Sequence, residues 1–133
     1  LNQAHVYPIG ALTQGLRGER LTEMAELNDA GCIVFGQPDG LLPNLRVLMQ
    51  AMRYASTFDF SVWLRPQEIS LTNDGVAHDG EVATRLGLPT VPVCAETVAL
   101  SNIILLTKET GVRVHLCRIS SAEGLAMIRA AKQ

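Results

Sequence analysis

The side chains best suited to chemistry include three histidines, His5, His78 and His115, which lie far apart in the sequence. A catalytic zinc ion usually takes three protein ligands and keeps one open position, so a metal site here has to assemble from distant positions. His78 falls in a loop before a predicted helix. For His115, in a predicted strand, a hydrogen-bonded core residue fits better than a lone ligand, because one imidazole binds a metal poorly without partners. The histidines alone give weak support for a metal.

Two arginines are more informative, because Arg65 and Arg118 each directly follow an apolar, strand-like segment. Pro66 lacks a backbone donor, so the strand before it ends near Arg65. The carboxyl ends of parallel strands are where α/β proteins bind their ligands. There the two guanidinium groups could form a cationic opening for a carboxylate, a phosphate or a protein partner. The alternative is a pair of ordinary surface arginines.

The elements that would position these side chains alternate between strands and helices. Apolar runs predict strands near 5–12, 32–35, 61–64 and 113–117. Helical spacing predicts helices near 21–31, 44–55, 80–86, 94–110 and 122–131. Asn44 is placed to cap the second of these helices, and Ser120 with Glu123 forms a capping-box pattern at the start of the last one. Gly31 and Gly111 are placed to end the first and the fourth helix. Such alternation favours parallel pairing, either in an arc of a (β/α)8 barrel or in an open four-stranded sheet.

Composition indicates one globular domain over residues 1–133, since 47% of the residues are hydrophobic. The net charge of -2 and the lack of a basic run argue against a nucleic-acid partner. The apolar runs are shorter than the roughly 20 residues of a membrane span, so we expect no membrane association and a cytoplasmic protein. We expect the three cysteines, Cys32, Cys94 and Cys117, to be reduced core thiols.

Several motifs in order resemble the dihydroorotases of the amidohydrolase superfamily. The most specific is GVAHDGEVATRLGLP at 75–89, which is similar to that family's His-Glu-Gly-Glu…Arg-Leu-Gly-Leu-Pro signature. Further similar segments lie at 10–13, 15–19, 23–27, 95–96 and 114–117. The resemblance covers essentially the whole chain and implies a partial (β/α)8 TIM barrel, about strands 3 to 6, of a metal-dependent hydrolase that opens or closes the dihydroorotate ring.

The metal-site positions implied by this resemblance are degenerate. Arg65 and Arg118 align with histidines expected after the fifth and sixth barrel strands. The acidic or carboxylated-lysine bridge after the fourth strand falls at Gln37, with Asp39 the nearest acid. A guanidinium group has no lone pair to donate and is permanently charged, so it cannot bind zinc. Active relatives hold zinc, whereas we expect no metal, no other cofactor and no catalytic residue here.

The pattern is similar to the noncatalytic dihydroorotase homologues that accompany bacterial aspartate carbamoyltransferases as structural subunits. The resemblance implies the catalytic chain of that enzyme as partner, with Arg17, Arg65 and Arg118 as contacts to an anion or to the partner. We also expect a homo-oligomer. One alternative is an active zinc-dependent dihydroorotase whose remaining ligands lie outside this segment. Another is an unrelated anion-binding module on an open sheet.

Overall fold

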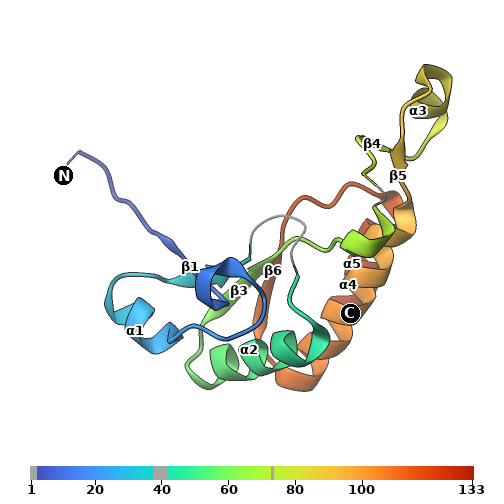
Figure 1. The fold of residues 1–133 in the computed structure, drawn as a ribbon. Coiled ribbons are helices and arrows are strands. Elements are labelled where there is room, and N and C mark those ends of the chain that lie inside the picture. Colours follow the sequence, from blue (N-terminus) through green and yellow to red (C-terminus); the bar gives the residue numbers. More distant parts are fainter. Residues whose placement is uncertain (1–2, 38–41, 73) are drawn as a thin grey trace.

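A four-stranded parallel sheet forms the centre of the protein. The computed structural model describes residues 3–37, 42–72 and 74–133. The strands are β1 (Ile9–Ala11), β2 (Val34–Gly36), β3 (Ser61–Leu64) and β6 (Arg113–Leu116), in the spatial order β1-β2-β3-β6 (Figure 1). All three pairings are parallel, with Val62 opposite both Phe35 and Val114. The predicted parallel sheet is therefore confirmed.

Helices connect the strands, as the alternating pattern predicted. They are α1 (Met24–Asp29), α2 (Leu45–Thr57), α4 (Val93–Thr110) and α5 (Ala122–Ala131), with short 3-10 turns η1 (Gln14–Leu16) and η2 (Ile69–Leu71). Asn44 caps α2 as predicted, because its Oδ1 accepts a hydrogen bond of 3.0 Å from the Val47 amide. Gly111 ends α4 with a φ of 69°, a left-handed conformation that glycine adopts without a steric penalty. Within the described residues, no helix is both long and apolar enough to cross a membrane.

The core lies between these helices and one face of the sheet. Alternation along β3 places Val62 and Leu64 on this face, where both are essentially fully buried. Burying side chains of this size stabilises a fold by about 1.5–3 kcal/mol each. The remaining large core residues come from the sheet and from α1, α2 and α4, and include Met24, Phe35, Leu48, Met52 and Ile103.

The opposite face of the sheet has little cover from the described residues. Trp63 on β3 is only half-buried, and its ring stacks on the exposed His115 of β6 with ring centroids 4.6 Å apart. Ile9 on the same face is 55% exposed. The expectation that His115 is a core residue is therefore wrong. Trp63 and His115 both occupy the alternate strand positions, which point away from the helices.

The observed bounds of two strands differ from the predicted ones. Of 5–12 only Ile9–Ala11 forms a strand, since Pro8 has no amide to donate and residues 3–8 extend away from the body (Figure 1). The strand predicted at 32–35 begins only at Val34. The turn after α1 continues to Cys32, whose amide donates to the Leu27 carbonyl oxygen.

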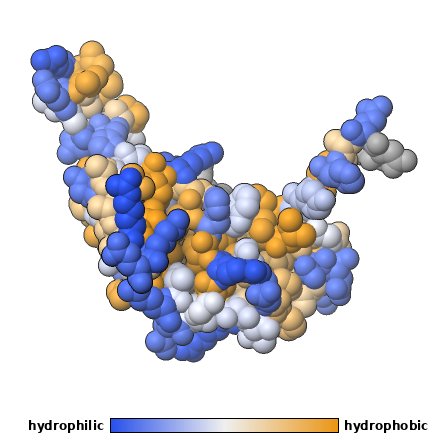
Figure 2. Space-filling view, turned by 180° about the vertical axis from the view of Figure 1, so that it is seen from behind, coloured by the Kyte–Doolittle hydropathy of each residue, from blue (hydrophilic) through white to orange (hydrophobic). Residues whose placement is uncertain are grey.

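An unpredicted arm projects from the body between β3 and α4 (Figure 1). It consists of β4 (Ala77–His78), the predicted short helix α3 (Glu81–Leu86) and β5 (Thr90–Val91), with β4 and β5 in parallel. Strands of two residues are too short to give a periodic sequence signal. Figure 2 shows the arm with a hydrophilic and an apolar side. Val82 and Leu86 of α3 are 70% and 67% exposed.

The cysteines only partly match the prediction. All three are free thiols, as expected. Cys32 is buried, but Cys94 is exposed at the start of α4 and Cys117 is half-buried after β6. Burial raises the pKa of the Cys117 thiol, which favours its neutral form.

Candidate functional site

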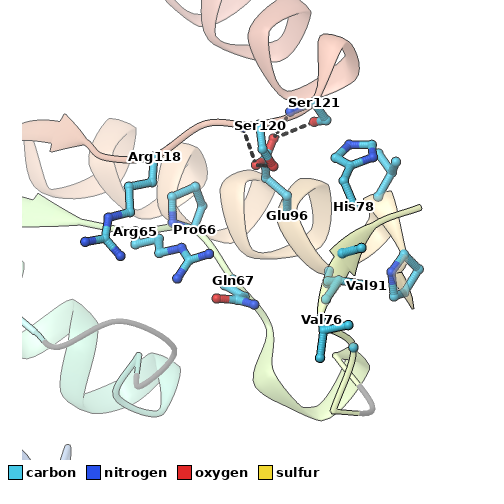
Figure 3. Close-up of a pocket in the computed structure, with 15 residues that line it drawn as sticks. Arg65, Pro66, Gln67, Val76, His78, Val91, Glu96, Arg118, Ser120 and Ser121 are labelled. Atoms are coloured by element: carbon cyan, nitrogen blue, oxygen red, sulfur yellow. Dashed lines mark hydrogen bonds between the residues drawn. The ribbon is translucent and has the colours of Figure 1, made fainter. Parts of the chain in front are cut away.

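A hollow of about 440 Å³ lies at the carboxyl ends of β3 and β6 (Figure 3). We call it the strand-end hollow. Arg65 and Arg118 both line it, and further lining residues are Gln67 of the loop after β3, His78 of the arm, Glu96 of α4 and Ser120 before α5. In Figure 3 the two arginines lie on one side of the view, His78 lies on the other, and Glu96 lies between them. The expectation that both arginines project from one edge is met in this structure.

Parallel register brings the two arginines to adjacent strand ends. Leu64 pairs with Leu116, and the Cys117 amide donates a hydrogen bond of 2.8 Å to the Leu64 carbonyl oxygen. Pro66 is buried directly after Arg65, so it ends the strand and fixes the direction of the chain. Backbone hydrogen bonds therefore hold the two strand ends together.

Arg118 has a positive φ of 56°, in the left-handed region that a non-glycine residue rarely occupies. In a continued strand, residue 118 would point to the helix-covered face with Val114 and Leu116. The left-handed conformation turns the chain at this residue, and Arg118 lines the strand-end hollow instead. Backbone strain of this kind, about 1–3 kcal/mol, persists only where the surrounding structure fixes it.

The chain after Arg118 is fixed by Glu96, a buried carboxylate on the first turn of α4. Its Oε2 accepts hydrogen bonds from the Ser120 amide at 2.8 Å and the Ser120 hydroxyl at 2.9 Å. Its Oε1 accepts from the Ser121 amide at 3.1 Å and from the Ser121 hydroxyl. Burial alone would raise the pKa of Glu96, but the hydrogen bonds from Ser121 and Ser120 outweigh it and lower the pKa. Glu96 is therefore a charged acceptor whose four donors are all supplied by one loop.

This arrangement corrects the predicted capping box at α5. The N-cap is Ser121, one residue later than expected, and its Oγ accepts from the Gly124 amide at 2.9 Å. The carboxylate of Glu96, on α4, accepts the hydrogen bond from the Ser121 amide, the amide of the N-cap residue. In the predicted capping box, Glu123 was to accept the hydrogen bond from the N-cap amide. A methyl group at Gly124 would overlap with Glu96 Oε1, so the third position of α5 must stay small.

The remaining predicted site residues are not all brought together. Gln37 Oε1 accepts a hydrogen bond of 2.9 Å from the Thr13 hydroxyl. Gln37 lines a neighbouring hollow of about 310 Å³, which Arg65 also lines. Arg17 lines a separate hollow with Glu19. Asp39 lies outside the described residues.

Sequence reasoning missed Glu96 as a site residue. It was noted only as part of the resemblance, since one acid in the first turn of an apolar helix is ordinarily a favourable partner of the helix dipole. The only local signal was the pair of serines after the last strand, which were assigned to a cap within their own helix. The pairing of Glu96 with residues 120 and 121 is a tertiary contact that no spacing rule specifies.

The chemistry of these side chains does not fit a zinc ion. Arg65 and Arg118 offer guanidinium groups, which have no lone pair for a metal and repel it. Glu96 already accepts four hydrogen bonds. Among the residues of the three described ranges, no three His, Cys, Asp or Glu side chains are grouped so that they could hold a metal ion.

Comparisons with a family model and with single proteins point to the same family. The family model described as dihydro-orotase-like matches residues 2–124. A dihydroorotase-like protein of Pseudomonas putida is 48% identical over 128 residues, covering 96% of this chain and 30% of that protein. A dihydroorotase-like protein of Pseudomonas aeruginosa is 43% identical, and a dihydroorotase of Syntrophotalea carbinolica is 37% identical. In both cases the match covers 97% of this chain and 30% of the relative. The chain therefore spans about three tenths of the length of these relatives.

A solved structure with the same fold is that of L-hydantoinase (dihydropyrimidinase) from Arthrobacter aurescens. The TM-score is 0.70 at 17% sequence identity, covering 95% of this chain and 29% of the hydantoinase. At this identity the likeness concerns the fold alone, and it assigns the parallel strands and their helices to a partial α/β barrel. By its family match and its relatives, the chain belongs to the dihydroorotase-like family of the amidohydrolase superfamily.

Proposed function

We propose that this chain is part of a dihydroorotase-like protein that does not hydrolyse cyclic amides and serves as a structural subunit of aspartate carbamoyltransferase. The observation that carries the proposal is the presence of Arg65 and Arg118 in one hollow at the carboxyl edge of the sheet. The family resemblance places zinc-binding histidines at both positions. The proposal further includes a cytoplasmic location and a homo-oligomer, the latter because the outer strands β1 and β6 have an unpaired edge in the described part of the chain.

Electrostatics supports the loss of metal chemistry at this edge. Zinc lowers the pKa of its bound water and polarises carbonyl groups, and both effects need neutral or anionic ligands around the ion. Two arginines replace that environment with permanent positive charge. The relatives from both Pseudomonas species are named dihydroorotase-like, whereas that of Syntrophotalea carbinolica is named dihydroorotase.

Turnover of dihydroorotate by the full-length protein tests the noncatalytic part. We expect no hydrolysis above the uncatalysed rate, and none when zinc is added. The Arg65→His/Arg118→His double variant is the matched comparison, because it restores the ligand type at both positions. Zinc-dependent turnover by the unaltered protein would instead support the alternative, an active dihydroorotase whose remaining ligands lie outside this segment.

Association with the catalytic chain of aspartate carbamoyltransferase tests the structural part. The two full-length proteins are mixed at micromolar concentration and low salt, and mass is followed by light scattering. We expect a single heavier species and a transcarbamoylase activity that depends on the mixture. Separate elution with unchanged activity would contradict the scaffold role. High salt should slow association if arginines such as Arg17 lie at the rim of the interface.

A further inference from the structure

We propose that the outer face of α4 is a docking surface for a second copy of this protein, and that the same helix of the other copy packs there antiparallel. The surface consists of Cys94, Val98, Ser101 and Leu105, which we call the α4 stripe. None of the four residues lines the strand-end hollow. The inference rests on the homo-oligomer included in the proposed function, and it names the surface through which that oligomer forms.

The α4 stripe lies on the side of the helix that faces away from the core. Ala99, Leu100 and Ile103 are buried on the inner side. The stripe residues follow one another at intervals of three or four, which keeps them on one side of the helix. Cys94 is exposed, Val98 is 42% exposed and Leu105 is 62% exposed. Figure 1 shows α4 at the outside of the molecule beside α5, so the stripe is accessible to another protein.

The composition of α4 is unusual for a helix with one side in water. Residues 97–107 contain no charged side chain. The neighbouring helix α2 packs on the same core, but its outer side carries Arg46, Gln50 and Arg53, all of them exposed. A helix with one side in solvent is normally polar there, whereas a helix that is apolar all round is normally covered on both sides. The sequence of α4 is therefore typical of a helix that lies between two bodies of protein.

The order of side chains along the stripe makes it complementary to itself. A two-fold axis brings the same patch of both copies together, so the two helices run antiparallel. With the axis at Ser101, Val98 of each copy faces Leu105 of the other, and the two serines face each other. A small side chain at the axis lets the two helices approach closely, and each larger apolar side chain has an apolar neighbour across the interface.

Charge also favours the antiparallel pair. The charged residues Lys108 and Glu109 lie at the end of the helix, outside the stripe, and both are exposed. In the antiparallel pair, Glu109 approaches the first turn of the other α4, where the helix dipole favours a carboxylate. The N-cap residue there, Pro92, provides no side-chain hydrogen bond to the amides of that turn. A parallel pair would instead place each of these charges beside the same charge of the other copy.

The length of the helix limits the strength of the contact. α4 has 18 residues and is about 27 Å long at a rise of 1.5 Å per residue. A pair of such helices is smaller than a standard interface of about 1,200–2,000 Å². We therefore expect the α4 contact to dissociate on dilution.

Disulfide trapping in the full-length protein tests the position of the axis. The variant is Ser101→Cys in a Cys94→Ser background, which removes the exposed thiol of the stripe. Facing Cα atoms of helices packed 8–10 Å apart are about 3.5–5.5 Å from each other, which overlaps the range that a disulfide spans. We expect oxidation with copper phenanthroline to give a covalent dimer. Gln50→Cys on the exposed side of α2, in the same background, is the matched control and should give none.

A charge within the stripe tests its energetic role. Leu105→Glu should weaken self-association of the full-length protein at least about tenfold in light scattering, because the contact would bury an unpaired carboxylate. Leu105 is largely exposed within one copy, so the variant should fold as the unaltered protein does, which circular dichroism checks. Arg53→Glu on the exposed side of α2 is the control and should leave association unchanged.

The inference is overturned if residue 101 forms no disulfide between copies, or if Leu105→Glu associates as strongly as the unaltered protein. It is also overturned if residue 101 is trapped only by the aspartate carbamoyltransferase chain in a mixture of the two. A protein that still forms a homo-oligomer in these cases uses another surface, so the homo-oligomer stands. A full-length protein that is monomeric at all concentrations contradicts both. Binding of the transcarbamoylase and dihydroorotate turnover are separate readouts.

Discussion

At the scale of single residues, Arg118 combines an unfavourable backbone with a position in the strand-end hollow. Its left-handed conformation costs about 1–2 kcal/mol relative to the strand or helix regions. Glycine would adopt the same φ without this penalty. The contacts around residue 118 therefore hold it in this conformation against its own backbone preference.

A comparison of Arg118→Gly with Arg118→Ala isolates this strain, because both variants remove the same side chain. We expect the glycine variant to have a free energy of unfolding about 1 kcal/mol higher than the alanine variant, although glycine usually makes the unfolded chain more flexible. Urea denaturation of both full-length variants provides the measurement. An alanine variant as stable as the glycine variant would show that residue 118 is not held in the left-handed region.

Gly124 is the second residue whose environment makes a sharp prediction. A methyl group there overlaps with the Glu96 carboxylate. Gly124→Ala should lower the free energy of unfolding by about 1–3 kcal/mol, a typical loss for overpacking. In a Glu96→Ala background the same change should cost much less, since the obstructing oxygen is gone. Equal losses in the two backgrounds, in a double-mutant cycle, would contradict the contact.

At the scale of elements, the side chain of Glu96 connects α4 to the start of α5 and to the loop after β6. It joins two segments separated by more than twenty residues through hydrogen bonds to both amides and both hydroxyls of a serine pair. Removal of Glu96 therefore leaves the buried donors of Ser121 without this acceptor. The loop that sets the direction of Arg118 depends on this contact.

The Glu96→Gln variant should be less stable than the unaltered protein by about 2 kcal/mol at neutral pH, since an amide oxygen replaces only part of a charged acceptor. The pKa of Glu96 is lowered by folding, so its contribution is fully present above the ordinary value of 4.5 and is lost as pH falls through the folded value. The difference between the two proteins should shrink below pH 4.5. Urea unfolding from pH 7 to pH 3 measures this, and a constant difference would exclude the charged form as the acceptor.

Local patterns predicted most elements but not the contacts between them. Ser61–Leu64 was predicted residue by residue, because a short apolar run before proline has few other interpretations. The parallel order then placed Arg65 and Arg118 at one edge correctly. The cap of α5 was displaced by one residue because its carboxylate comes from Glu96, and the strands of the arm were too short to detect. Position 39 cannot be compared, since it lies outside the described residues.

At the scale of the whole molecule, one face and two edges of the sheet remain available for contact with other protein. In the described part of the chain, β1 and β6 are the outer strands, and the face that carries Trp63 and His115 has no helix over it. Unpaired strand edges and exposed apolar faces promote association. Relatives about three times as long supply further chain that could cover them.

The segment of 133 residues, produced alone, should therefore self-associate, whereas the full-length protein should form a species of defined mass. Light scattering over a range of concentrations distinguishes the two. A segment that stays monomeric at all concentrations would show that the open face and the strand edges need no cover.

The zinc content of the full-length protein, measured by elemental analysis after dialysis, tests the central claim most directly. If Arg65 and Arg118 have replaced a metal site with a cationic one, the purified protein should hold far less than one zinc ion per chain. Stoichiometric zinc, together with dihydroorotate turnover that a chelator abolishes, would contradict the claim and identify an active enzyme.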